Sequence, residues 1–294
     1  MMRIKFKHLA NTLVTFVFFV AITMISAIPA EVSSLVWTVN SKGEVWTLDE
    51  QGGGKLYSTT GFAGDIGVGA DGTVWTITTQ PQVGEGGNIP AWLSDPETSK
   101  WTKLGSPAAA IRIAVGPDGI AWTVNSKGEV WTLNKPSGGG LLYSSPGFAK
   151  DIGVGADGTV WVVTTEPQVG GGGNILAWLS EPNKGAWGWT KLGSPAAAIR
   201  IAVGPDGTAW TVNSKGEVWT LNKPAGGGLR YSSPGFAKDI GVGVDGTVWV
   251  VTTEPQVGQA GNVLAWLSEP NKGAWGWTKL SSPAAAIRIA VGSD

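Results

Sequence analysis

The sequence contains long internal repeats, and these constrain its fold more than any other feature. Residues 121–206 recur at 209–294 with an offset of 88 residues and eight differences. A third, more diverged copy begins at Leu35. Repeated units of this kind bury their apolar faces against one another, so neighbouring copies are expected to stack in space.

Each copy divides into two related halves, and each half contains four short apolar segments. The first two segments flank an Asp-Gly pair, and the second is centred on Trp. Asp-Gly between apolar runs is the strongest short-range signal for a β-hairpin. The pairs are Asp71-Gly72, Asp118-Gly119, Asp157-Gly158, Asp206-Gly207 and Asp245-Gly246. The sequence therefore predicts an all-β fold of six four-stranded units, which is typical of the blades of a β-propeller.

The points at which the repeats start and stop predict how such a ring closes. The chain ends on the segment that opens every other half, whereas the first half lacks that segment and begins at Ser34. We therefore expect Ile287 to Val291 to pair with the strand that contains Trp37, which closes a six-bladed propeller over residues 34–294 and leaves no open edge in the ring of blades. The alternative, an open solenoid, needs atypical capping repeats at both ends, and the sequence shows none.

Most of the 17 tryptophans occupy equivalent positions in the six halves. Twelve form pairs on the second and third predicted strands: Trp37 and Trp46, Trp75 and Trp92, Trp122 and Trp131, Trp161 and Trp178, Trp210 and Trp219, and Trp249 and Trp266. Both faces of a middle strand are covered when blades stack, so we expect these twelve to pack between blades.

Two tryptophans fall outside this pattern and are candidate sugar-binding residues. Trp187 and Trp275 lie in the repeated sequence Pro-Asn-Lys-Gly-Ala-Trp-Gly-Trp, between the third and fourth predicted strands, where the diverged copy has Ser99. A loop Trp flanked by Gly can present its face to a sugar ring. The alternative is a Trp that folds back over its own blade.

Polar residues near these loops complete the candidate set. Gly-rich segments connect the second and third strands of every other half, and they are either binding loops or plain connectors. The predicted carbohydrate-binding residues are Trp187, Trp275, Asn183, Asn271, Gln168, Gln256, Asn174 and Asn262. The Asn-Ser-Lys-Gly sequences that start at Asn40, Asn125 and Asn213 are expected to be tight turns.

Composition excludes much of the chemistry of enzymes. The chain has no Cys, and its one His is His8. A Ser-His-Asp triad, a Cys-His dyad and a zinc site built on Cys or His are therefore excluded once the leader is removed. The carboxylates recur in every copy, so no single asymmetric pair suggests glycoside hydrolysis. We expect no catalysis, no metal and no cofactor, and the lack of a basic cluster argues against a nucleic-acid partner.

The first 30 residues have the layout of a secretory signal peptide. Arg3, Lys5 and Lys7 precede an uncharged apolar stretch from Leu13 to Ile28, and small residues follow for cleavage. The stretch is shorter than the roughly 20 residues that span a bilayer. We expect a secreted, extracellular protein without stable membrane insertion after cleavage. The alternative is an uncleaved signal anchor.

The half-repeat resembles the tectonin repeat, and residues 34–294 resemble tectonin-type β-propeller lectins. The resemblance is carried by GVGADGTVWVV (153–163), GEVWTL (128–133), and Trp189-Thr190-Lys191-Leu192 followed by Ser194-Pro195-Ala196 and Ile199 to Gly204. It implies binding of microbial or cell-surface glycans, including lipopolysaccharide or modified sugars, and a role in innate immunity. Intracellular relatives act as protein scaffolds, so a protein-binding propeller is the alternative. No binding residue of the family is carried over to this chain.

The repeats also suggest how a weak lectin reaches useful affinity. The three copies are expected to provide three equivalent weak sites. Simultaneous engagement of linked sites on a repetitive surface raises avidity by about 10²–10⁴ over a single site.

Overall fold

The computed structural model describes the ranges 34–48, 54–58, 63–81, 88–93, 101–103, 110–134, 138–142, 149–167, 174–179, 189–192, 197–221, 228–230, 237–255, 262–267, 277–281 and 286–293. The chain groups into two units, Met1–Glu31 and Val32–Asp294. The predicted signal peptide, residues 1–30, lies outside the described residues. All of the described residues belong to the second unit.

The described residues form strands and turns without a helix, and the strands make six antiparallel sheets of four strands each. The first three sheets comprise β24 (Ala286–Ser293), β1 (Ser34–Asn40), β2 (Val45–Leu48) and β3 (Gly54–Ser58); β4 (Ala63–Val68), β5 (Val74–Pro81), β6 (Asn88–Leu93) and β7 (Trp101–Lys103); and β8 (Ala110–Val115), β9 (Ala121–Asn125), β10 (Val130–Asn134) and β11 (Gly138–Leu142).

The other three sheets repeat the same pattern. They comprise β12 (Ala149–Val154), β13 (Val160–Pro167), β14 (Asn174–Leu179) and β15 (Trp189–Leu192); β16 (Ala198–Val203), β17 (Ala209–Asn213), β18 (Val218–Leu221) and β19 (Gly228–Arg230); and β20 (Ala237–Val242), β21 (Val248–Pro255), β22 (Asn262–Leu267) and β23 (Trp277–Ser281). The predicted all-β class is confirmed.

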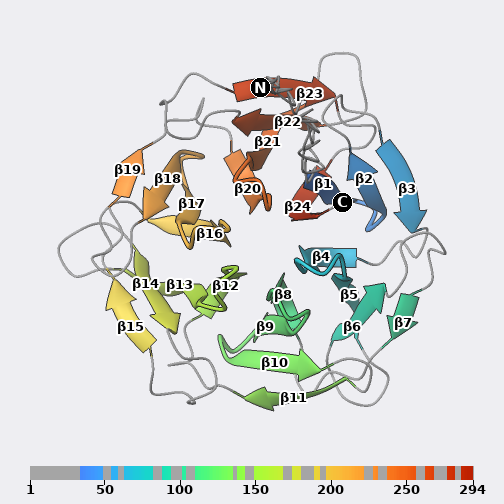
Figure 1. The fold of residues 1–294 in the computed structure, drawn as a ribbon, viewed down its shortest axis with the longest axis vertical. Helices are drawn as coiled ribbons and strands as arrows, with labels where there is room; N and C mark the ends of the chain where they lie inside the picture. Colours follow the sequence, from blue (N-terminus) through green and yellow to red (C-terminus); the bar gives the residue numbers. More distant parts are fainter. Residues whose placement is uncertain are drawn as a thin grey trace, which may run out of the picture. The chain divides into compact units, whose positions relative to one another are not determined.

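One strand of each sheet lies nearest the centre of the unit in Figure 1: β4, β8, β12, β16, β20 and β24. These innermost strands contact one another in that order, and β24 in turn contacts β4. The first sheet takes its innermost strand from the other end of the described chain, because β24 pairs with β1 from Ser34↔Ser293 through Trp37↔Ala290. The expected pairing of the last strand with the strand of Trp37 is therefore present.

The Asp-Gly pairs form the turns that follow the innermost strands. In the turn after β4, Gly72 has a φ of 77° and its N–H donates to the carbonyl of Gly69 over 3.0 Å. The Asp71 carboxylate accepts the N–H of Thr73 over 3.0 Å. Glycine fits here because a positive φ carries a steric penalty for residues with a Cβ. The hairpins predicted from Asp-Gly have this structural basis.

The Asn-Ser-Lys-Gly sequences also form tight turns, as predicted. The buried side chain of Asn125 organises its turn, since its Oδ1 accepts the N–H groups of Lys127 and Glu129 over 3.0 and 2.9 Å. Its Nδ2 donates to Glu129 Oε2 over 2.6 Å. The turns that start at Asn40 and Asn213 make the same contacts.

Six apolar clusters fill the spaces between neighbouring sheets. Each contains one second-strand Trp packed against the next sheet, as Trp161 packs with Ala198 and Ile201. Every second-strand Trp is at most 5% exposed: Trp37, Trp75, Trp122, Trp161, Trp210 and Trp249. Burial of one Trp side chain contributes an upper bound of about 4–6 kcal/mol. These clusters therefore bind each sheet to its neighbours, including the last to the first through Trp249 and Val36.

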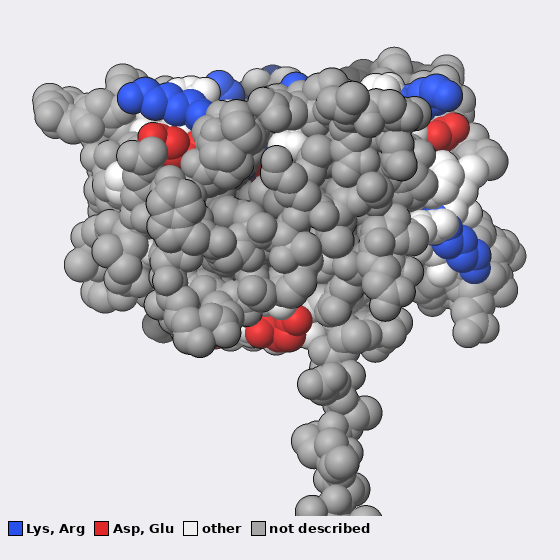
Figure 2. Space-filling model, turned by 90° about the horizontal axis from the view of Figure 1, so that it is seen from above, with Lys and Arg blue, Asp and Glu red and all other residues white. Residues whose placement is uncertain are grey.

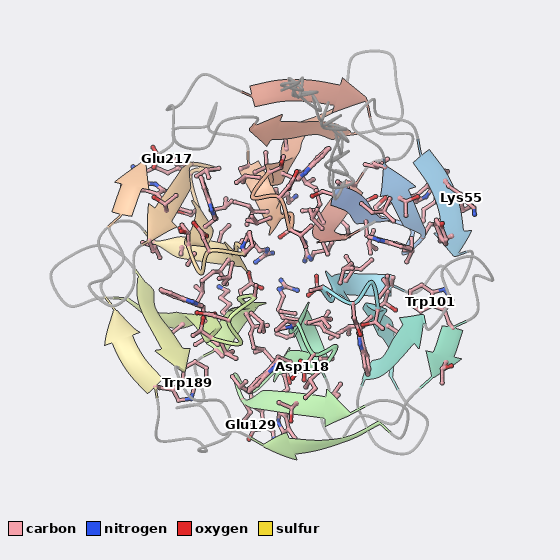
Figure 3. The ribbon with its side chains drawn as sticks, in the orientation of Figure 1. Lys55, Trp101, Asp118, Glu129, Trp189 and Glu217 are labelled. Carbon is pink, nitrogen blue, oxygen red and sulfur yellow. The ribbon has the colours of Figure 1, made fainter. Side chains whose placement is uncertain are left out.

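The third-strand tryptophans differ from the expectation. Trp46, Trp131 and Trp219 are half-buried, because each lies one strand closer to the periphery than its partner. The side chains of Trp92, Trp178 and Trp266 lie outside the description. The outermost-strand residues Trp101 and Trp189, labelled in Figure 3, are half-buried and pack against two of the clusters.

The described residues include no helix that is long and apolar enough to span a membrane.

Candidate functional site

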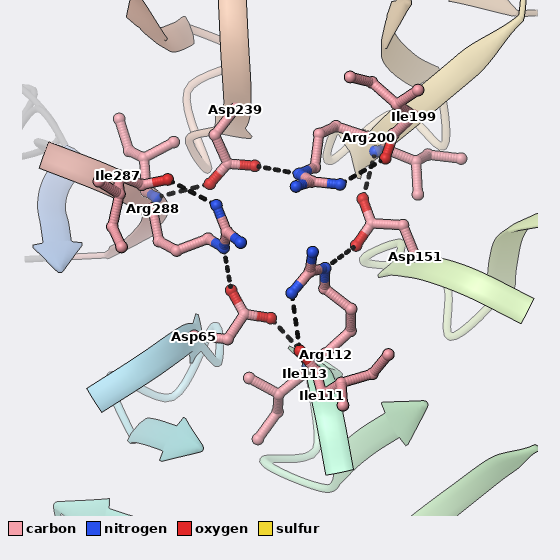
Figure 4. Close-up of polar contacts among 12 residues, drawn as sticks. Asp65, Ile111, Arg112, Ile113, Asp151, Ile199, Arg200, Asp239, Ile287 and Arg288 are labelled. Atoms are coloured by element: carbon pink, nitrogen blue, oxygen red, sulfur yellow. Dashed lines mark hydrogen bonds and ion pairs between the residues drawn. The ribbon is translucent and has the colours of Figure 1, made fainter. Parts of the chain in front are cut away.

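Six charged side chains lie where the innermost strands meet. Three are aspartates on β4, β12 and β20, and three are arginines on β8, β16 and β24. They alternate around the centre, as Figure 4 shows, and we call them the axial charge ring: Asp65, Arg112, Asp151, Arg200, Asp239 and Arg288.

A β-bulge precedes every member of the axial charge ring. In β12 the pairing with β13 shifts between Ala149 and Asp151, and in β8 it shifts between Ala110 and Arg112. The other four innermost strands shift at the matching residues. A shift of one residue moves a side chain to the other face of a strand, so the bulges change the direction in which these charges point.

Each arginine forms an ion pair with an aspartate of the following sheet. The distance from Nε to Oδ1 is 3.5 Å for Arg112 and Asp151, and 3.4 Å for Arg200 and Asp239. Arg288 and Asp65 complete the series at 3.4 Å. The third pair joins the last strand of the described chain, β24 of the first sheet, to β4 of the second sheet.

Each aspartate also holds the backbone of the strand that follows it. Asp65 Oδ2 accepts the N–H of Ile113 over 3.0 Å, and Asp151 Oδ2 accepts that of Ile201 over 2.9 Å. Asp239 bonds Ile289 in the same way over 2.9 Å. These carboxylates therefore satisfy N–H groups on strand edges that have no further strand to pair with.

The buried position of the carboxyl groups raises their pKa values. Loss of water around Asp151 raises its pKa to about 6, despite the attraction of Arg200 and Arg112. The same cause raises the pKa of Asp239 to about 7, against the attraction of Arg288. Burial also raises the pKa of Asp65 above its ordinary value. Desolvation thus outweighs the arginines, as is common for buried ion pairs.

The arginines retain hydrogen-bonding capacity. Nη1 of Arg112, Arg200 and Arg288 donates to the carbonyl of the preceding isoleucine over 2.8, 2.7 and 2.8 Å. Their buried Nε atoms lie at ion-pair distance from the aspartates but make no hydrogen bond to the described residues. Figure 4 shows the three guanidinium groups directed towards the space between them.

A narrow cavity continues from the axial charge ring along the innermost strands. Its volume is about 100 Å³, and its wall begins with the isoleucine that follows each charged residue, such as Ile66 after Asp65 and Ile113 after Arg112. A second cavity of about 70 Å³ lies at the other ends of the same strands and is lined by residues such as Val115 and Pro117. Both cavities are lined by all six innermost strands, so these strands run in the same direction.

The two ends of the innermost strands carry different charged residues, and the end with the lysines also has Glu44, Glu129 and Glu217 in its turns. At their beginning lie five exposed lysines, which define the lysine face: Lys42, Lys127, Lys150, Lys215 and Lys238. At their far end lie the turn residues Asp71, Asp118, Asp157, Asp206 and Asp245, which define the aspartate face. Figure 2 shows basic side chains along the upper edge, with acidic side chains beside some of them, and further acidic side chains at the lower edge. The sequence showed no basic cluster because these lysines are far apart along the chain.

The predicted sugar-binding residues fall almost entirely outside the described residues. This holds for Gln168, Gln256, Asn183, Asn271, Trp187 and Trp275. Asn174 and Asn262 begin β14 and β22 and pair with Pro167 and Pro255, but their side chains are not described.

The topology separates the predicted residues into two sets. Asn174 and Leu179 are the two ends of β14. The segment with Gln168 joins the strand at Asn174, whereas the segment with Asn183 and Trp187 leaves it at Leu179. The described strand therefore connects these segments at opposite ends.

The sequence contained a signal for the axial charge ring that the candidate set missed. Asp151 interrupts the otherwise apolar end of Ala-Lys-Asp-Ile-Gly-Val, and Arg112 interrupts Ala-Ile-Arg-Ile-Ala-Val. A charge in the middle of a buried strand needs a partner, and here each type occurs three times at matching positions. No group of metal-ligating side chains occurs among the residues that the structure describes.

The family model of the Tectonin domain matches residues 88–293, well over half of the sequence. The chain belongs to the tectonin family. The resemblance found in the repeat motifs is thereby confirmed, and with it the β-propeller character of this tectonin. None of the curated proteins matches the sequence.

Solved structures show the same fold at low sequence identity. TolB from Acinetobacter baumannii has a TM-score of 0.65 at 13% identity, and the match covers 88% of the tectonin chain and 66% of TolB. A protein of unknown function from Bacteroides caccae has a TM-score of 0.58 at 12% identity, over 88% of this chain and 98% of that one. YCF48 bound to D1 peptide has a TM-score of 0.50 at 17% identity, over 83% and 77%. These likenesses concern the fold alone.

Proposed function

We propose that residues 34–294 form a closed six-bladed β-propeller. Three observations support this: the six four-stranded sheets, the return of the contacts from β24 to β4, and the pairing of β24 with β1. Closure by a strand from the other end of the chain gives the first sheet its innermost strand, so the ring of sheets has no gap.

We further propose that this propeller is a secreted lectin that binds microbial or cell-surface glycans without catalysis. The observation that carries the proposal is the presence of three related copies, two of them nearly identical, on a tectonin scaffold. Such a scaffold presents corresponding loops three times, and linked weak sites on a repetitive surface gain avidity by about 10²–10⁴. The described carboxylates at the centre are each held by an arginine and a backbone N–H, which supports a structural or binding role for them.

The loops with Trp187 and Trp275 are the proposed sugar sites. A glycan array with competition by free sugar tests the function directly. Replacement of both residues by Ala should weaken binding and leave the melting temperature unchanged, while Trp187→Phe, which keeps an aromatic face, should retain most binding. Ser99→Trp should strengthen the site of the diverged copy and raise avidity, because Ser99 stands at the position that matches Trp187 and Trp275.

Failure of the protein to bind any glycan would contradict the lectin proposal. The second candidate function is a protein-binding propeller, and the likeness to YCF48 bound to D1 peptide favours it, since that protein uses a similar fold to hold a peptide. Absence of glycan binding together with a saturable protein complex would support this candidate.

A further inference from the structure

We propose that the axial charge ring binds one oxyanion, a sulfate or phosphate group, between Arg112, Arg200 and Arg288. The proposal goes beyond the lectin function, because the site lies among the innermost strands and uses none of the predicted sugar-binding residues.

The three arginines have hydrogen-bond donors that no described residue uses. Each guanidinium carries five N–H donors in a planar fork that matches an oxyanion. Within the described residues, Arg200 makes one hydrogen bond, to the carbonyl of Ile199, and its ion pair to Asp239 lacks hydrogen-bond geometry. Arg112 and Arg288 are in the same state. The Nε atoms face the aspartates, so the donors that a ligand could use are those of the outer guanidinium nitrogens.

The aspartates do not occupy the outer nitrogens of the guanidinium groups. Both oxygens of Asp151 are engaged, Oδ1 with Arg112 Nε and Oδ2 with the N–H of Ile201. Asp65 and Asp239 are engaged in the same way. The outer nitrogens of the guanidinium groups are thus left for a ligand that approaches along the axis, and Figure 4 shows them facing one another.

The arginines are accessible from solvent, and other basic side chains lie at the same end of the strands. The arginine side chains are between 13% and 17% exposed, so an anion reaches them without unfolding. The cavity next to the ring, about 100 Å³, is well above the roughly 10–15 Å³ that one water requires. The five lysines of the lysine face outnumber the three glutamates of the same turns at this end of the strands, which favours the approach of an anion.

The charges that face the site predict how binding depends on pH. They are Asp65, Asp151 and Asp239 from β4, β12 and β20, and the three arginines from β8, β16 and β24; Lys150 and Lys238 lie next to two of the aspartates. The carboxyl groups of Asp239 and Asp151 take up protons as the pH falls through about 7 and about 6, respectively. The net charge of the ring then becomes positive. Affinity for sulfate, whose own charge stays constant in this range, should rise several-fold from pH 8 to pH 5.5.

The test is a calorimetric titration of the full chain with sodium sulfate at pH 6, with chloride used to keep the ionic strength constant. We expect saturable binding of one sulfate per chain. Arg200→Lys keeps the positive charge but removes the planar fork, and the loss of a hydrogen bond to a charged group should weaken binding about 10- to 100-fold. Arg112→Lys and Arg288→Lys should behave alike, so one poorly folded variant does not decide the test. Lys55→Gln, which removes a cation from the outer strand β3, should leave binding unchanged.

Two ligands distinguish the source of the oxyanion. Glucose 6-sulfate that competes with inorganic sulfate would indicate a substituent on a sugar, whereas binding of inorganic sulfate alone would indicate a free ion; either result supports the site. Absence of saturable sulfate binding by the wild-type chain would overturn it. Equal affinity in the wild type and all three folded lysine variants would overturn it as well. None of these results depends on whether the tryptophan loops bind glycans.

Discussion

The buried aspartates predict that this protein loses stability as the pH rises through neutrality. Asp151 has a pKa of about 6 in the folded protein, above its ordinary value of 3.8. The folded state therefore binds the proton more tightly than the unfolded state. The stabilisation is fully present below about pH 4 and is lost as the pH rises through 6. Its full size is on the order of 3 kcal/mol, of which about 1.4 kcal/mol disappears between pH 5 and pH 8.

Asp151→Asn isolates this contribution. The side-chain oxygen of Asn can still accept the N–H of Ile201, but the buried negative charge is gone. The variant should be at least as stable as the wild type at pH 8, and its stability should depend less on pH. Asp151→Ala, by contrast, leaves that N–H without its acceptor and should cost about 1–3 kcal/mol.

Urea unfolding between pH 5 and pH 8 measures these differences. The range lies above the titration of ordinary carboxyl groups and of Asp245, where hydrogen bonds from Thr247 and Ser34 outweigh burial and lower the pKa. Wild-type stability should fall across the range, with a further loss from Asp239, whose pKa is about 7. Wild-type stability that stays level or rises with pH, or an Asp151→Asn variant with the same pH dependence as the wild type, would refute this reasoning.

Three further substitutions test the packing and the turns. Trp161→Ala empties the cluster between two sheets and should cost about 3–5 kcal/mol in urea unfolding, and a loss under 1 kcal/mol would contradict the packing described. Asn125→Ala removes the hydrogen bonds that organise its turn, so we expect a loss of about 1–3 kcal/mol, with Ser126→Ala on the exposed part of the turn as a nearly neutral control. Gly158→Ala places a Cβ at a φ of 78° and should cost about 1–2 kcal/mol by thermal melting; an unchanged melting temperature would show that the turn adopts another conformation.

Much of the fold was predictable from the sequence because the repeats indicate which strands pair and which sheets are neighbours, as well as where the turns lie. The Asp-Gly pairs identified the turns, and the Trp of each second strand identified the interface between sheets. The position of Ser34 relative to Val291 identified the pairing of β1 with β24, since both ends of one repeat must meet in one sheet.

The axial charge ring was not predicted, although its residues are plain in the sequence. Periodicity marks Asp151 and Arg112 only as polar residues in apolar strands. Their convergence depends on the β-bulge that precedes each of them and on the arrangement of six strands around one axis. Both are tertiary features, and spacing along the chain does not encode them. The lysine face was not predicted for the same reason, since Lys215 and Lys238 come to the same end of the strands only through folding.

The sugar-binding residues remain a prediction from the sequence. Trp187 and Trp275 lie outside the described residues, and so does Gln168; their role in sugar binding stays a prediction.

We propose that the pairing of β24 with β1 closes the ring of sheets. Because the chain has no Cys, Ser34→Cys with Ser293→Cys introduces one defined pair at positions that face each other in β1 and β24. We predict an intramolecular disulfide under mild oxidation, seen as a loss of two hydrogens by mass spectrometry and as faster migration on a non-reducing gel. Ser34→Cys with Ile287→Cys, which is out of register, should remain reduced. Free thiols or only intermolecular dimers in the Ser34 and Ser293 pair would contradict closure.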